Sequence, residues 1–258
     1  MGTKFSTRVW VSVVGIASIF FGSKGYADTV ISVADFGLKP DTRENAVAYV
    51  QKAIEACRGK EPVTLVFPEG RYDFWPQYAH EKNYYETNTY DVFPKRLAML
   101  FEGLHNITVD GNGSQFVMHD RIQPITVENC DGVTLKNFSI DWDIPLTAQA
   151  RVTKVGSDFF EIEINVLESP YIIEDGKLVF VGEGWKSALG SMIEFESDTH
   201  FVVPGTGDLV LGWNWGDYTA VSPRYGIVRL SRKGGFERYP AEGNWLVLRH
   251  STRDHAGI

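Results

Sequence analysis

The sequence predicts an all-β protein in which the first coils of a parallel β-solenoid carry an inserted antiparallel β-domain. Three observations support this architecture. A strand–turn–strand pattern at residues 100–111 recurs at 126–137. Short apolar runs separated by Gly, Pro, Asp and Ser residues fill the segment 147–243. The segment 44–57 has apolar residues spaced by three and four, as an amphipathic helix does.

The composition is that of a foldable, acidic chain. Of the 258 residues, 43% are hydrophobic and 22% are charged, which excludes a disordered protein. The formal net charge is -8, and it falls further if Lys4, Arg8 and Lys24 are removed with an N-terminal leader. Nucleic acid is therefore not expected as a partner, because its phosphate backbone carries charge of the same sign.

Residues 1–27 are predicted to be a secretory signal peptide. Lys4 and Arg8 precede an uncharged apolar run, Val9 to Phe21, that is too short to span a bilayer comfortably. Ala27 provides a small residue at the expected cleavage position. The alternative is an N-terminal membrane anchor. We expect a periplasmic or extracellular protein that has no membrane segment after cleavage.

Residues 28–146 are expected to hold an N-terminal cap and the first coils. A β-rich run at 31–37 precedes the predicted helix, and a continuous apolar strand at 63–67 follows it. The next segment, 68–74, is a Pro-Glu-Gly turn and a short extended run. A helix at this place would cover the open end of a solenoid.

The internal repeat is the most informative pattern in the chain. An offset of 26 residues aligns Glu102 with Glu128 and Thr108 with Thr134, and it keeps four other positions apolar. Each copy fits one coil of a parallel solenoid, whose apolar face is covered by the next coil. Two unrelated hairpins remain the alternative, because stable arrays usually have three or more copies.

The repeat pattern disappears at residue 147, and hairpin-like alternation replaces it up to residue 243. At 244–250 a solenoid-like strand returns, so 244–258 is expected to resume the solenoid. No terminal cap follows this strand. We therefore expect the chain to be the N-terminal piece of a longer protein.

Three short stretches resemble the entry segment of the pectin-lyase-like β-helix superfamily. They are Val33–Gly37, Gln51–Ile54 and Val66–Tyr72. The resemblance implies a right-handed parallel β-helix with a capping helix. It is more informative about fold than about function, because one fold hosts many activities.

Longer stretches are similar to glycoside hydrolase family 110, the exo-acting α-1,3-galactosidases. They are residues 72–76, 137–150, 176–187 and 248–258. This resemblance implies an inverting hydrolase that removes terminal α-1,3-linked galactose from glycans without a metal or cofactor. It also implies that the insertion is β-barrel-like. The family's catalytic aspartates are expected beyond Ile258, so none is assigned in this chain.

Asp141 and Asp143 are candidate substrate-binding residues. On a strand, residues two apart share a face and lie about 6–7 Å apart. That distance is close to the separation of about 6.5–9.5 Å between the carboxyl groups of inverting glycosidases. We assign the pair to substrate contact, because the family's acids are expected elsewhere. The alternative is a turn, since Asp143 precedes Ile-Pro and aspartate is common in turns.

Arg253, Asp254 and His255 form the second candidate substrate-binding group. Arginine and histidine side chains suit galactose hydroxyls, and the three residues lie in a dense polar run. The spacing of five from His250 to His255 is not that of a helical metal site, so no metal is expected. A solvated turn with an Arg–Asp pair is the alternative.

Two rival functions remain open for this sequence. A polysaccharide lyase would need a Ca²⁺-binding acidic cluster and a basic residue that abstracts a proton, and the acidic residues here are too scattered for that. A non-catalytic glycan-binding protein is the other rival. Cys57 and Cys130 are expected to be buried free thiols, although the predicted compartment permits a disulfide.

Overall fold

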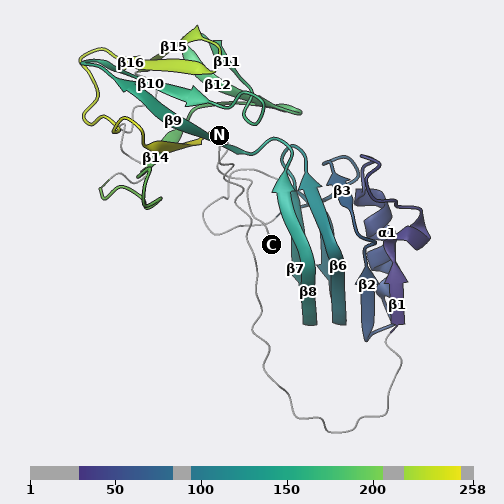
Figure 1. Ribbon diagram of the computed structural model, residues 1–258. Helices are drawn as coiled ribbons and strands as arrows, with labels where there is room; N and C mark the ends of the chain where they lie inside the picture. The colour runs from purple at the N-terminus through teal and green to yellow at the C-terminus, as the bar shows by residue number, and fades with distance from the viewer. Residues whose placement is uncertain (1–28, 84–93, 206–217, 251–258) are drawn as a thin grey trace. The chain divides into compact units, whose positions relative to one another are not determined.

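The computed structural model describes residues 29–83, 94–205 and 218–250 (Figure 1). As predicted, the protein is mostly β-structure. The chain divides into two compact units, which we call unit 1 (up to Trp142) and unit 2 (Asp143–Asp254). Within the described ranges, none of the helices is long and apolar enough to cross a membrane.

Unit 1 contains a short cap and the parallel strands. Its elements are β1 (Thr29–Ser32), the 3-10 helix η1 (Val33–Phe36), α1 (Val47–Cys57), β2 (Val63–Val66), β3 (Arg71–Phe74), β4 (His80–Lys82), β5 (Lys95–Glu102), β6 (His105–Met118), β7 (Gln123–Glu128) and β8 (Asp131–Trp142). The strands β1, β2, β6 and β3 form one sheet in that order, and β8 pairs with β6. The strands β4, β5 and β7 form a second sheet.

The parallel pairs between the two copies of the repeat join residues that lie 26 positions apart, the offset of the sequence repeat, up to a register shift between β6 and β8 after which the offset is 24. In one sheet Phe101 pairs with Val127, and in the other Ile107 pairs with Val133. Figure 1 shows β6 and β8 side by side along their length. All pairs of these two sheets are parallel except β4 with β5. The aligned segments of the repeat are therefore partners in space.

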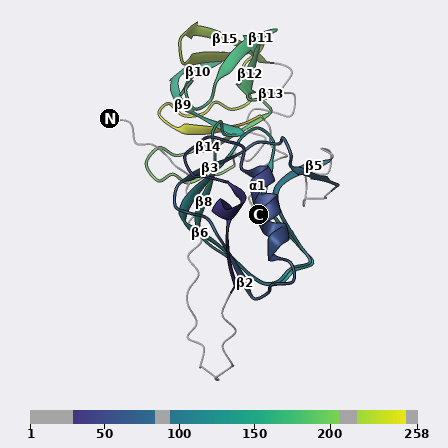
Figure 2. The same ribbon diagram turned by 90° about the vertical axis from the view of Figure 1, so that its right-hand side faces the viewer.

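Helix α1 begins later than the sequence predicts. The apolar spacing suggested a start at residue 44, whereas the helix starts at Val47. The reason is that Asn45 forms a parallel bridge to Asp73 and its side chain accepts the backbone N–H of Val47. The buried face of α1 packs beside η1, β1, β2 and β5. Figure 2 shows α1 beside β5.

The core of unit 1 has an aromatic centre. Phe116 on β6 lies 4.7 Å from Phe67, 5.7 Å from Phe74 and 4.9 Å from Phe138, measured between ring centroids. Phe67, Phe74 and Phe116 are fully buried. Because these rings come from different parallel segments, the cluster joins them into one core.

Unit 2 is entirely antiparallel within its described residues. Its strands are β9 (Thr147–Val155), β10 (Phe159–Ile164), β11 (Tyr171–Glu174), β12 (Lys177–Gly182), β13 (Trp185–Ala188), β14 (Ser191–Phe195), β15 (Tyr218–Arg224), β16 (Ile227–Arg232) and β17 (Trp245–Arg249). Six of them form a sheet in the order β14-β17-β9-β10-β16-β15, and β11, β12 and β13 form a second sheet.

The strand near the end of the chain differs from the prediction. Residues 244–250 were expected to return to the solenoid, but Trp245–Arg249 forms β17 of unit 2, antiparallel to both β14 and β9. Leu246 and Leu248 are buried there. An alternating strand fits a parallel or an antiparallel ladder equally well, so the local pattern did not reveal its partner.

Candidate functional site

Three parallel strands of unit 1 end at the same level. Phe74 of β3 pairs with Met118 of β6, and Met118 pairs with Trp142 of β8. The residues at these ends therefore come from three different segments but lie at one edge of the sheet. We call Asp73, Trp75, His119 and Asp141 the strand-end site.

Asp73 is the buried centre of this site. Its carboxylate accepts hydrogen bonds from Arg71 Nε at 3.0 and 3.1 Å, from Arg71 Nη2 at 2.6 Å and from His119 Nε2 at 2.8 Å. Burial alone raises the pKa of Asp73, but the hydrogen bonds from Arg71 and His119 outweigh it and hold the pKa below its ordinary value. Asp73 is thus an ionised, fully paired carboxylate.

His119 is held in a fixed orientation by its neighbours. Because the ionised Asp73 can only accept, Nε2 of His119 carries a proton. The indole of Trp75 stacks on the imidazole at 3.8 Å between centroids, with 13° between the planes. Asn45 in turn accepts the backbone N–H of Trp75 at 3.2 Å and donates to its carbonyl at 3.4 Å. The arrangement pre-orients an imidazole at the end of β6.

Asp141 lies exposed near the end of β8, as the candidate role requires. Its Oδ1 accepts the backbone N–H of Trp142 at 2.8 Å, which fixes the carboxylate. Trp142 is half-buried and packs against the core of unit 1. The expected alternation between these two residues is therefore present. The assignment of Asp141 to substrate contact stays a prediction.

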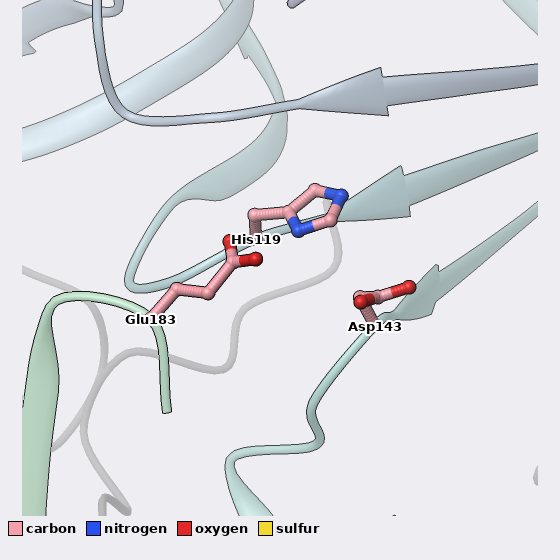
Figure 3. Close-up of side chains that lie close together, drawn as sticks. All are labelled: His119, Asp143 and Glu183. Carbon is pink, nitrogen blue, oxygen red and sulfur yellow. The ribbon is translucent and has the colours of Figure 1, made fainter. Parts of the chain in front are cut away.

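Asp143 does not continue the strand. β8 ends at Trp142, and the exposed Asp143 is the first residue of unit 2. The strand geometry assumed for the Asp141–Asp143 pair therefore does not apply at its second member. Figure 3 shows the side chains of His119, which follows β6, Asp143, which follows β8, and Glu183, which lies between β12 and β13.

The second predicted group lies outside the described residues. This applies to Arg253, Asp254 and His255, whose role stays a prediction. The neighbouring His250 is described, and its ring stacks on Phe180 at 4.4 Å and on Trp185 at 5.1 Å between centroids. His250 is thus part of the packing of unit 2.

Sequence reasoning did not single out Asp73 or His119 as members of the site. Asp73 lies in the family-like stretch 72–76, which was the available signal. His119 carried no local signal, because only the pairing of β3 with β6 brings it to Asp73.

The chemistry of the strand-end site suits binding rather than proton transfer. Carboxylate, imidazole and indole groups are the side chains that accept sugar hydroxyls and stack on sugar rings. Asp73 is unsuited to act as a general acid, since its partners keep it ionised. Asp73 and His119 are buried and paired with each other, so among the ionisable groups of the site the exposed Asp141 is the one open to a ligand.

Both parts of the chain are similar to known proteins. Residues 148–246 match the family model "GLAA-B beta-barrel domain I". The chain is 58% identical over 234 residues to α-1,3-galactosidase B of Bacteroides thetaiotaomicron, covering 90% of this chain and 38% of that protein. It is 33% identical over 226 residues to α-1,3-galactosidase A of Shewanella woodyi, covering 87% and 36%. It is 34% identical over 239 residues to α-1,3-galactosidase A of Bacteroides fragilis, covering 90% and 38%. The chain thus spans less than two fifths of the length of these relatives.

Proposed function

We propose that this chain, which is homologous to the α-1,3-galactosidases, forms the N-terminal portion of a glycoside hydrolase that removes terminal α-1,3-linked galactose from glycans. One observation carries the proposal: 58% identity over 90% of the chain to a protein with that name. The 234 aligned residues cover 90% of the chain and therefore include residues of both units. It supports a shared fold and a shared substrate class.

The proposed architecture is an incomplete right-handed parallel β-helix with a β-barrel-like insertion. The parallel ladders with their offset of 26 residues support stacked coils in unit 1. Helix α1 supports a capped beginning, because its apolar face is buried against the first strands. The domain family matched by residues 148–246 supports a β-barrel in unit 2.

The proposed reaction is hydrolysis with inversion. It needs a carboxylic acid that protonates the leaving oxygen and a carboxylate that activates water, and it needs no metal or cofactor. We place these two groups in polypeptide that follows residue 258. The strand-end site would contribute substrate contacts, in which the exposed Asp141 accepts sugar hydroxyls.

We also propose that the protein is secreted. The predicted signal peptide at 1–27 would deliver the enzyme to the periplasm or the cell exterior, where glycans with terminal α-galactose are its partners. Cell fractionation followed by N-terminal sequencing would test this, and a mature protein beginning at Asp28 is expected.

The activity is tested with a fusion of this chain and the remaining part of the Bacteroides thetaiotaomicron relative. Incubation with a disaccharide that ends in α-1,3-linked galactose should release galactose, and proton NMR should show the β-anomer first. Release of the α-anomer first would contradict inversion. No release by a folded fusion would contradict the proposed function.

The role of Asp141 is tested in the same fusion. Asp141→Asn should raise KM about tenfold and leave kcat nearly unchanged, as expected for a lost contact of about 1.4 kcal/mol made in the ground state and the transition state alike. Asp131→Asn is the matched control, because Asp131 is also exposed on β8 but lies at its other end. Equal KM values for both variants would show that Asp141 does not contact the substrate.

A further inference from the structure

The large sheet of unit 2 has a face that points away from the core of that unit. Phe195 of β14 pairs with Trp245 of β17, and Trp245 pairs with Arg151 of β9. Arg151 pairs in turn with Glu163 of β10. On each of these strands such residues alternate with buried ones, so the four share the opposite face. We call Phe195, Trp245, Arg151 and Glu163 the outer row, which is about 14 Å long at the usual spacing of strands.

The two aromatic rings of the outer row have no stacking partner within the described part of the chain. Phe195 and Trp245 are half-buried, and neither ring stacks on another ring or carries a cation there. Phe159 differs, although it lies on the same face of β10. Arg229 lies 4.4 Å and Lys154 5.7 Å from the centroid of its ring. The ring of Phe159 is therefore already occupied by two cations, whereas the rings of the outer row are not.

The charged side chains of the outer row are likewise not paired with any described residue. Arg151 and Glu163 are exposed, and neither forms a side-chain hydrogen bond or an ion pair within the described ranges. Gln149 is exposed on the same face of β9, two residues before Arg151. By contrast, Arg229 and Glu161 of this face are paired, with Nε of Arg229 2.9 Å from Oε1 of Glu161. The outer row thus offers donors and acceptors that the fold itself does not use.

Aromatic rings beside polar groups of both kinds suit a chain of sugars. Sugar rings have apolar C–H faces that pack on aromatic side chains, and hydroxyl groups that need both donors and acceptors. Arg151 and Glu163 carry opposite charges, so the outer row has no net charge and favours a neutral ligand over a polyanion. A second copy of this chain would fit less well, because the cores of protein interfaces are depleted in charged residues.

We propose that the outer row of unit 2 binds a neutral oligosaccharide. Trp245 and Phe195 stack on its sugar rings, and Arg151 and Glu163 form hydrogen bonds with its hydroxyl groups. The inference rests on the proposed function, which makes a glycan the partner of this protein. It adds a glycan contact in unit 2 to the contact proposed for Asp141 in unit 1.

Calorimetric titration of the whole chain with a neutral tetrasaccharide that ends in α-1,3-linked galactose tests the stacking. Trp245→Ala should weaken binding about fivefold, and Trp245→Phe should retain most of the affinity because it keeps an aromatic ring. Phe159→Ala is the matched control, since it removes an aromatic ring of the same face and should leave the affinity unchanged. Circular dichroism would confirm that each variant is folded. Equal losses for Trp245→Ala and Phe159→Ala, or no binding by the folded chain, would overturn the proposal.

A second pair of substitutions tests the charged side chains of the row. Arg151→Ala should weaken binding about threefold through the loss of hydrogen bonds, and it should leave the fold intact because Arg151 is exposed. Lys154→Ala removes another exposed cation of β9 and should leave the affinity unchanged. A sulfated form of the same tetrasaccharide should bind no more tightly than the neutral form. Equal losses for the two variants, or tighter binding of the sulfated form, would contradict the proposal.

Two further outcomes separate this inference from its rivals. Analytical ultracentrifugation that shows a dimer, lost on Trp245→Ala, together with no binding of the tetrasaccharide would assign the outer row to a second copy and overturn the proposal. Hydrolysis by the fusion described above without binding that depends on Trp245 would refute this inference alone. Binding that depends on Trp245 without hydrolysis by a folded fusion would refute the proposed function alone.

Discussion

Unit 1 and unit 2 differ in the direction in which their β-strands pair. Unit 1 pairs most of its strands in parallel with partners from other segments of the chain, such as Phe101 of β5 with Val127 of β7. Unit 2 pairs its strands antiparallel, and its first and last strands are neighbours, with Thr147 of β9 opposite Arg249 of β17. A unit whose chain enters and leaves at adjacent strands can be inserted without separating the segments on either side. Within the described residues, unit 2 thus pairs its first strand with its last, whereas unit 1 adds parallel strands side by side.

The two units also hold their buried carboxylates differently. Asp73 of unit 1 is paired with the cationic Arg71 and with His119. Glu194 of unit 2 is also buried. Its Oε1 accepts the backbone N–H of Ala241 at 2.8 Å and the amide of Asn244 at 2.7 Å, and Nη2 of Arg238 lies 3.9 Å from its Oε2. The first carboxylate organises side chains at strand ends, and the second fixes the loop before β17.

The largest effect is expected from the aromatic core of unit 1. Phe116→Ala should reduce the free energy of unfolding of unit 1 by about 4 kcal/mol, because it removes a buried ring that packs against several others. Urea unfolding followed by hydrogen exchange would measure it. Phe160→Ala, at an equally buried position of β10, should affect the exchange of unit 2 instead. A joint loss in both units after either change would show that they unfold together.

The next effect concerns the buried ion pair. Asp73→Asn should cost unit 1 about 3 kcal/mol, because it leaves Arg71 beside a neutral group. Circular dichroism during urea unfolding would measure the loss. Asp141→Asn is the matched control, since this carboxylate is exposed, and a change within about 0.5 kcal/mol is expected. Similar losses of unfolding free energy for the two variants would show that the pairing of Asp73 does not stabilise unit 1.

A smaller loss is expected from the carboxylate of unit 2. Glu194→Ala should destabilise unit 2 by about 2 kcal/mol, because two donors lose a charged acceptor. Glu194→Gln keeps an acceptor oxygen and should recover more than half of the loss. The measurement is the free energy of unfolding of unit 2 from hydrogen exchange. If Gln were as destabilising as Ala, the charge rather than the hydrogen bonds would matter.

The acid sensitivity of unit 1 follows from the same pairing. The pKa of Asp73 is lowered from 3.8 in the folded protein, so its stabilisation is fully present above that value and is lost as the pH falls through the folded pKa. The free energy of unfolding of unit 1 should therefore decrease below about pH 4. Asp73→Asn should remove this part of the decrease. An unchanged acid profile in the variant would contradict the assignment.

The smallest effect belongs to a surface ion triad. Lys82 on β4 lies 2.7 Å from Glu102 and 2.6 Å from Glu128, which face each other as partners on β5 and β7. Lys82→Met should lower the melting temperature of unit 1 slightly, since two like charges are left opposite each other. About 1 M salt should abolish the difference, because it screens exposed charges. A loss that persists in high salt would indicate packing by the lysine stem.

Local patterns predicted the elements that depend on neighbouring residues. The spacing of apolar residues in the 44–57 segment predicted the helix but placed its start three residues before Val47. Asn45 instead pairs with Asp73 of β3, which no local pattern encodes. The 26-residue offset predicted which segments of β5 to β8 become partners, because a repeat carries its own register.

The candidate site was predictable only in part. Asp141 was identified from its place on a strand, and it is exposed there. Asp73 and His119 were not identified, because they are 46 residues apart and meet only through the pairing of β3 and β6. Their chemistry depends on a distance of 2.8 Å that is set by this pairing.

The sequence by itself determined the β-rich class, the change of pattern at the boundary of the insertion and the likeness to α-1,3-galactosidases, since these depend on residue types and their order. The tertiary structure alone decided that Trp245–Arg249 joins unit 2 and that Asp73 orients His119. The physical reason is that a strand's alternation fixes its faces, whereas its partner is selected by packing between segments that are distant in the chain.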